Sequence, residues 1–73
     1  MNLVGLPGAV KRDRTFWLDL DSVKLAYVEP NGIEFCWVFR LGDDFIVRVK
    51  NFGVFKEAQV ALDKFLLANC KKR

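Results

Sequence analysis

The chain has 73 residues, of which 52% are hydrophobic and 14% aromatic, and its 12 Lys and Arg against 9 Asp and Glu give a formal net charge of +3. This composition suffices for one compact core and argues against global disorder. No apolar run approaches the ~18 residues that span a membrane, and Gly5, Pro7 and Gly8 interrupt the opening segment. We therefore expect no secretion signal, no membrane span and no membrane partner.

The positive charge belongs mainly to the two ends of the chain. Residues 11–14 carry a net charge of +2 and residues 71–73 carry +3, whereas residues 15–70 hold six basic and eight acidic side chains. Proteins that bind nucleic acid usually gather positive charge on one folded face. The net charge alone therefore gives little support to nucleic-acid binding.

The two cysteines, Cys36 and Cys70, are too few for a disulfide framework, and the strands predicted below place them on opposite sides of the sheet. We therefore expect a reducing, cytoplasmic compartment. Cys36 is predicted to be a small buried or half-buried residue, with a reactive thiol as the alternative.

The first elements are an arm and a strand. Residues 1–14 mix glycine, proline and charge without a steady period, which predicts a flexible basic arm. A period-two run of apolar residues begins at Phe16 and resumes at Val23 after a bend that Ser22 can introduce. This pattern predicts either one long bent strand or two short ones.

Two more period-two runs complete a predicted three-stranded meander. The segment "EPNG" offers the first turn, because Pro30 fixes its own φ and both Asn31 and Gly32 tolerate a positive φ. The remaining segments are the second strand "IEFCWVFRL" (33–41), the turn "GDD" (42–44) and the third strand (45–50).

The pattern then takes the period of a helix, which we expect from Val54 to Cys70. Glu57 in its first turn and the basic tail, residues 71–73, suit the helix dipole. Strands followed by one helix predict an α+β fold, β-β-β-α, with the helix on one face of an antiparallel sheet and residues 15–70 as a single domain. The helix face expected to pack on the sheet consists of Phe55, Ala58, Ala61, Leu62, Phe65, Leu66 and Asn69.

One sheet face is much more apolar than the other, and we predict that it forms the core against the helix. The alternative, an exposed aromatic platform that stacks on bases, would expose far more apolar surface than monomers usually do. RNA-binding sheets also carry their aromatic residues on the face away from the helices. The predicted core face consists of Phe16, Leu18, Leu20, Ile33, Phe35, Trp37, Phe39, Leu41, Phe45, Val47 and Val49.

The opposite face mixes apolar and charged residues, as protein-binding hot spots do. It holds Trp17, Asp19, Asp21, Glu34, Cys36, Val38, Arg40, Ile46, Arg48 and Lys50. Alternatively, Leu3, Val4, Leu6 and Val10 of the arm fold back over this face. The predicted partner-binding residues are Trp17, Val38, Arg40, Ile46, Arg48 and Lys50, with Lys11, Arg12 and Arg14 of the arm.

The sequence argues against an enzyme. Without histidine it cannot assemble a Ser-His-Asp or Cys-His site. The carboxylates of Asp19 with Asp21, and of Asp43 with Asp44, are best interpreted as solvated pairs. Two cysteines fall short of a zinc site, and no glycine-rich phosphate loop opens the helix. We predict no catalytic residue, no metal, no cofactor and no small-molecule substrate.

The segment "LGDDFIVRVKNFGVFKEAQVALDKF" has an aromatic residue before the helix and alternating Glu and Ala within it. It resembles the three-strand-plus-helix DNA-binding domains of the AP2 and phage-integrase type through Gly42, Phe52, Phe55, Glu57, Ala58 and Ala61. The resemblance implies Trp17, Arg40, Arg48 and Lys50 in the major groove and Lys11, Arg12 and Arg14 on phosphates. Asp19, Asp21 and Glu34 on the same face would repel the DNA backbone.

A face of Trp, Arg and aliphatic residues interspersed with carboxylates suits a protein partner better than phosphate. In size, single-domain build and basic ends, the chain resembles the very small regulators with which lytic phages take over host enzymes. The resemblance implies a non-enzymatic transcription regulator, an inhibitor or antiterminator, that binds host RNA polymerase in the host cytoplasm. The alternatives are a DNA-binding domain and a subunit that pairs through an outer strand or through Val60 and Leu67 on the helix.

Overall fold

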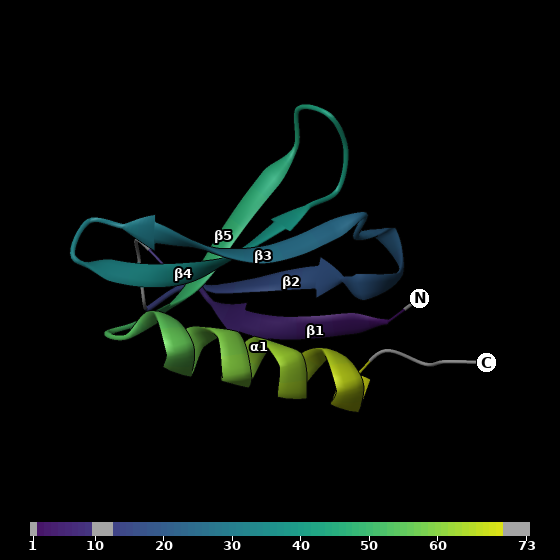
Figure 1. Ribbon diagram of the computed structural model, residues 1–73. Helices are drawn as coiled ribbons and strands as arrows, with labels where there is room; N and C mark the ends of the chain where they lie inside the picture. The colour runs from purple at the N-terminus through teal and green to yellow at the C-terminus, as the bar shows by residue number, and fades with distance from the viewer. Residues whose placement is uncertain (1, 10–12, 70–73) are drawn as a thin grey trace.

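The computed structural model describes residues 2–9 and 13–69, so Met1, Val10, Lys11, Arg12, Cys70 and the tail at 71–73 lie outside the described residues. The described part has an α+β fold in which one C-terminal helix packs on a three-stranded sheet (Figure 1). No helix in it has the length and apolar character needed to cross a membrane. The elements are β1 (Leu3–Pro7), β2 (Thr15–Asp19), the 3-10 helix η1 (Leu20–Ser22), β3 (Leu25–Asn31), β4 (Glu34–Arg40), β5 (Ile46–Phe52) and α1 (Phe55–Asn69).

The predicted meander is confirmed, because β3, β4 and β5 form one antiparallel sheet in that order. Its first turn differs from the prediction: Pro30 and Asn31 belong to β3, and the loop is Gly32–Ile33. Gly32 has φ +70, and a glycine in the first position of a two-residue loop is typical of a type II′ hairpin turn. Pro30 is tolerated because β3 is an edge strand of this sheet.

The second turn lies where the sequence predicts it, but it is longer. It spans residues 41–45 and is closed by the amide of Leu41, which donates to the carbonyl of Phe45 at 3.0 Å. Phe45 therefore precedes β5 and is exposed, and its predicted place in the core was wrong. In Figure 1 this turn projects from the rest of the molecule.

A bulge in β5 reverses the face on which its last residues lie. Trp37 pairs with Val49, whereas Cys36 pairs with Asn51, so Lys50 is an extra residue without a partner across the ladder. Lys50 has φ 56, and its ammonium group lies 5.2 Å from the centre of the Trp37 ring. Lys50 thus lies on the helix side, and its predicted place on the outer face was wrong.

This bulge gives a prediction about stability. Left-handed backbone costs about 1–2 kcal/mol for a residue that has a Cβ atom, and glycine avoids this cost. We expect Lys50→Gly to be more stable than Lys50→Ala by ~1 kcal/mol, the reverse of the usual order in a strand. Neither variant keeps the ammonium group over Trp37, so the difference between their free energies of urea unfolding isolates the backbone effect. Equal stability would contradict the prediction.

Residues 3–7 form strand β1, which pairs antiparallel with β2, so the prediction of a flexible arm was wrong for this segment. Leu6 is buried and Val4 half-buried in the same core as Leu18 of β2, which explains why the segment is ordered. On the other side of the hairpin the Trp17 ring covers Gly5, where a Cβ atom would come within 3.1 Å of it.

The run from Phe16 onward forms two short strands, as one of the two predicted alternatives has it. β2 ends at Asp19 and η1 separates it from β3, and the two strands belong to different sheets. The carboxylate of Asp19 accepts hydrogen bonds from the amide of Asp21 at 3.1 Å and the hydroxyl of Ser22 at 3.3 Å. These bonds stabilise η1 and hold the chain in the reversal.

The core lies between the three-stranded sheet, α1 and the β1–β2 hairpin. The aromatic row of β4 faces it, with Trp37 and Phe39 buried and in edge-to-face contact at 6.3 Å. The indole nitrogen of Trp37 donates to the carbonyl of Ala58 at 3.1 Å, which ties α1 to the sheet. The row is therefore structural, as predicted, except that Ile33 lies in the turn and is 95% exposed. Phe16 on β2, which was also predicted on the core face, is exposed.

A second, smaller cluster covers the outer face of the sheet. Cys36 and Val38 are fully buried there beneath Ala9. The side-chain amide of Asn51 donates to the carbonyl of Ala9 at 2.7 Å, and Gly8 forms a bridge with Val49. The N-terminal segment thus covers part of this face, but the predicted covering residues were wrong: Val4 packs against the main core and Leu3 is exposed, while Val10 lies outside the described residues. The covering residue is Ala9, whereas Leu6 lies in the main core.

Candidate binding groove

The described residues form an open hollow of ≈ 560 Å³ between β2 and the β4–β5 turn. Hollows of this volume, apolar with a few polar groups, commonly bind ligands. We call it the β2 groove. It is lined by Leu3, Phe16, Trp17, Leu18, Asp19, Leu41, Phe45, Ile46, Val47 and Arg48.

The walls of the groove present large apolar side chains to solvent. Trp17 on β2 is 70% exposed and Phe45 in the opposite turn is 60% exposed. Phe16 and Leu3 are also exposed. A 73-residue chain that leaves several such side chains together in one hollow forgoes stabilisation that their burial would provide.

Trp17 packs against its neighbour across the β1–β2 hairpin. It is paired with Gly5 across the β1–β2 ladder, and its ring packs where a side chain of that residue would be. One face of the indole therefore contacts the hairpin while the rest remains open to the groove. A Trp side chain has only two dihedral angles to fix, so it binds with little loss of conformational entropy, which is a property of hot-spot residues.

A carboxylate lies at the end of β2 that leads into η1. Asp19 accepts hydrogen bonds from the amides of Asn2 and Asp21, both at 3.1 Å. The bond from Asn2 is the main influence that lowers the pKa of Asp19 below its ordinary value. Asp19 therefore stays negatively charged at neutral pH and gives the groove one permanently acidic end.

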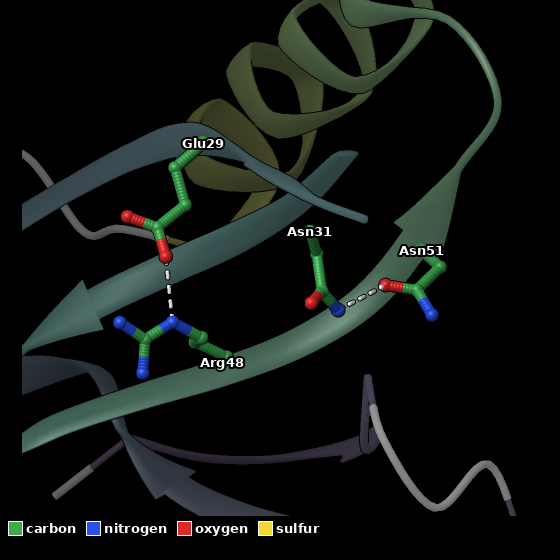
Figure 2. Close-up of polar contacts among 4 residues, drawn as sticks. All are labelled: Glu29, Asn31, Arg48 and Asn51. Carbon is green, nitrogen blue, oxygen red and sulfur yellow. Dashed lines mark hydrogen bonds and ion pairs between the residues drawn. The ribbon is translucent and has the colours of Figure 1, made fainter. Parts of the chain in front are cut away.

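Two polar pairs cross the outer face of the sheet above β4 (Figure 2). Arg48 on β5 donates from its Nε to Glu29 on β3 at 2.6 Å, and Asn31 donates to Asn51 at 3.4 Å. The hydrogen bond that Glu29 accepts, followed by the negative charge of Glu29, raises the pKa of Arg48 above its ordinary value. Arg48 is thus already paired with a carboxylate where it borders the groove.

The Arg48 pair gives a second prediction about stability. Arg48→Glu places two carboxylates 19 residues apart in sequence but adjacent in space, so we expect a lower melting temperature. Adding Glu29→Arg restores the attraction in reverse, and the double variant should recover most of the loss. Thermal unfolding of the wild type, the two single variants and the double variant measures the coupling free energy between residues 29 and 48, which should shrink as salt is added. A double variant no more stable than Arg48→Glu would contradict the pairing.

The structure brings together only part of the predicted binding surface. Trp17, Ile46 and Arg48 line the groove. Val38 is fully buried, so its predicted contact with a partner was wrong, and the cause is the cover provided by Ala9. Lys50 faces the helix side because of the bulge.

The remaining predicted residues lie away from the groove lining. Arg40 is half-buried and donates from Nη2 to the carbonyl of Asp43 at 3.2 Å. Arg14 is exposed at the start of β2, and Lys11 and Arg12 lie outside the described residues. Sequence patterns missed Leu3 and Phe45 as groove residues. Phe45 directly follows Asp43 and Asp44, a position that favours an exposed turn over a core strand.

Cys36 and the outer side of α1 offer less support for a functional site. Cys36 is buried, and burial followed by the charge of Glu29 raises the pKa of its thiol, which favours the unreactive protonated form. On α1, Val60 and Leu67 are exposed on the side away from the sheet, as predicted. The described residues contain no cluster of three or more potential metal ligands.

No protein-family model matches the chain, and neither a curated protein nor a solved structure is significantly similar to it.

Proposed function

We propose that this protein is a small regulator without catalytic activity of its own, which acts by binding a larger protein through the β2 groove. The observation that supports this is the exposure of Trp17 and Phe45 on opposite walls of one hollow. Aromatic residues at the centre of a patch with charged residues at its rim are the usual composition of a protein-binding hot spot. Asp19 and Arg48 supply that rim.

The groove gives less support to DNA binding. Arg48 is paired with Glu29, and Lys50 lies over the Trp37 ring on the helix side. Asp19 adds a negative charge at the rim of the groove. Affinity for DNA depends on cations that neutralise phosphates, and these positions offer few that are free of a carboxylate neighbour.

The first partner to test is bacterial RNA polymerase, because the chain resembles small phage transcription regulators in size, build and basic ends. That resemblance identifies no interacting residue, so we propose the residues that contact the partner from the β2 groove alone. Inhibition or antitermination would follow if the groove occupied a surface that polymerase needs during initiation or pausing.

The experiment is binding of the immobilised protein to purified RNA polymerase and to a nuclease-treated bacterial lysate, each with wild type and with Trp17→Ala. We expect polymerase to be retained by the wild type only, with a weak dependence on salt. A shift of labelled DNA that weakens steeply and linearly with log salt would favour the DNA-binding alternative. Equal retention by both proteins would exclude the groove as the binding site.

A further inference from the structure

We infer that the segment of the partner that enters the β2 groove is an extended, alternately apolar strand, which pairs with the open edge of β2. This inference rests on the proposed function, since it specifies the chemistry of the partner at the same groove. Such strand addition joins main-chain hydrogen bonds, which give affinity, to side-chain pockets, which give specificity.

The hydrogen-bond pattern of the β1–β2 hairpin shows which backbone groups are available. Leu20 donates to the carbonyl of Asn2 at 3.0 Å, and Gly8 donates to the carbonyl of Arg14 at 2.9 Å. Hydrogen-bonded pairs alternate with non-bonded ones along an antiparallel ladder. By this alternation Phe16 and Leu18 bond to β1, whereas the N–H and C=O groups of the intervening residues point away from it.

These outward-pointing groups belong to Thr15, Trp17 and Asp19, and the structure gives their backbone atoms no partner among the described residues. An edge of this kind is a ready template for another strand. Burial under a partner without hydrogen bonds would be costly, so whatever covers the edge must supply its own donors and acceptors. An extended main chain does so in the required alternation.

The side chains of the groove agree with this geometry. Phe16 and Leu18 point to one face of β2, Trp17 and Asp19 to the other, and all four line the groove. A hollow lined from both faces of a strand runs along its edge, not across one face. A strand laid there would place successive side chains alternately toward Phe16 and toward Trp17, and both positions are apolar.

Two other occupants fit less well. A second copy of this chain would bring β2 with β1 bonded to its other edge, so a ribbon of two strands would have to enter beside the β4–β5 turn. A helix about 10 Å wide satisfies its own backbone groups and would leave those of Thr15 and Trp17 unpaired. A single extended segment needs the width of one strand, about 4.8 Å.

The probe for this inference is a displayed library of random peptides of about eight residues, which spans the five residues of β2. Selection is carried out on the whole protein, with Trp17→Ala as the counter-selection. We expect enriched peptides to alternate apolar and polar residues with period two. Enrichment with helical spacing, or no enrichment over the Trp17→Ala protein, would overturn the inference.

The most enriched peptide is then made in two forms, with N-methyl groups on alternate residues of one edge or of the other. We expect one form to bind about tenfold more weakly or worse, because it cannot donate to β2, and the other to bind normally. In the protein, the bound peptide should slow amide exchange of Trp17 by about tenfold. Equal binding of both forms, or no protection of that amide, would overturn strand pairing.

The outcomes separate this inference from the proposed function. If the enriched peptides have helical spacing and polymerase binding depends on Trp17, the proposed function is supported but the inference of an extended strand is contradicted. Protection of the Trp17 amide without peptide, in a protein that sediments as a dimer, would assign the edge to a second copy and overturn the inference. Polymerase binding unaffected by Trp17→Ala would overturn the function first.

Discussion

Replacing Phe39 with alanine is expected to destabilise the protein by about 3–5 kcal/mol, the usual range for removing a buried phenyl ring from a core. Phe39 is fully buried, and its ring contacts Trp37 and Phe65 with centroids 6.3 Å away in each case. A domain this small has a stability of only a few kcal/mol from its core. Phe39→Ala should therefore be largely unfolded at 25 °C, as measured by urea titration of Trp fluorescence.

Two variants make the test informative if Phe39→Ala does not fold. Phe39→Leu keeps most of the apolar volume, so it should fold with a smaller loss of stability. Ile33→Ala removes an apolar residue that the period-two pattern puts on the same face, yet its side chain is 95% exposed. It should change stability by less than about 0.5 kcal/mol. A large loss for Ile33→Ala beside a small one for Phe39→Ala would mean that the strand is wrongly assigned.

The parts of the fold that the sequence predicts well are those determined by local periodicity. The meander and the helix are confirmed, and the helix begins at Phe55 and ends at Asn69, within a residue of the predicted ends. Each of these elements repeats its apolar residues with a steady period, and each strand of the meander pairs with the strand next to it in sequence. Propensity and packing therefore favour the same conformation.

The parts that could not be predicted depend on contacts between distant residues. The bulge at Lys50 shifts the alternation by one position, so that Phe52 joins the helix side and Asn51 the outer side. A period-two pattern has no mark of such a shift when the extra residue is lysine instead of glycine. Strand β1 was missed for a related reason, because Gly5 suits a strand only where the Trp17 ring covers it.

The candidate groove was half predictable. Trp17, Ile46 and Arg48 were recognisable as residues of the outer face because they alternate with core residues. Val38 follows the same alternation, but Ala9, distant in sequence, buries it. The reverse holds for Phe45: the alternation predicts it in the core, but the longer turn leaves it 60% exposed. Alternation identifies the two faces of a strand but not what covers either of them.

Replacing Trp17 with alanine is expected to weaken partner binding by at least about 2 kcal/mol, roughly 30-fold in Kd, because Trp residues dominate the energy of hot spots. The loss of its contact with Gly5 should cost only about 0.2–1 kcal/mol of stability, as for other cross-strand pairs. The variant therefore separates binding from folding. Titration calorimetry with purified RNA polymerase measures the first effect, and thermal unfolding measures the second.

The matched control is Leu67→Ala on the outer side of α1, which truncates an apolar side chain that is 82% exposed and outside the groove lining. If exposed apolar surface in general held the partner, Leu67→Ala and Trp17→Ala would weaken binding alike. If the groove holds the partner, Phe45→Ala on the opposite wall should also weaken binding. The double variant of Trp17 and Phe45 should lose less binding free energy than the sum of the two single variants, because one ligand contacts both walls and loses both contacts when it leaves. The binding surface would lie elsewhere if the effects of Trp17→Ala and Phe45→Ala on the binding free energy were fully additive and Leu67→Ala weakened binding as much as Trp17→Ala.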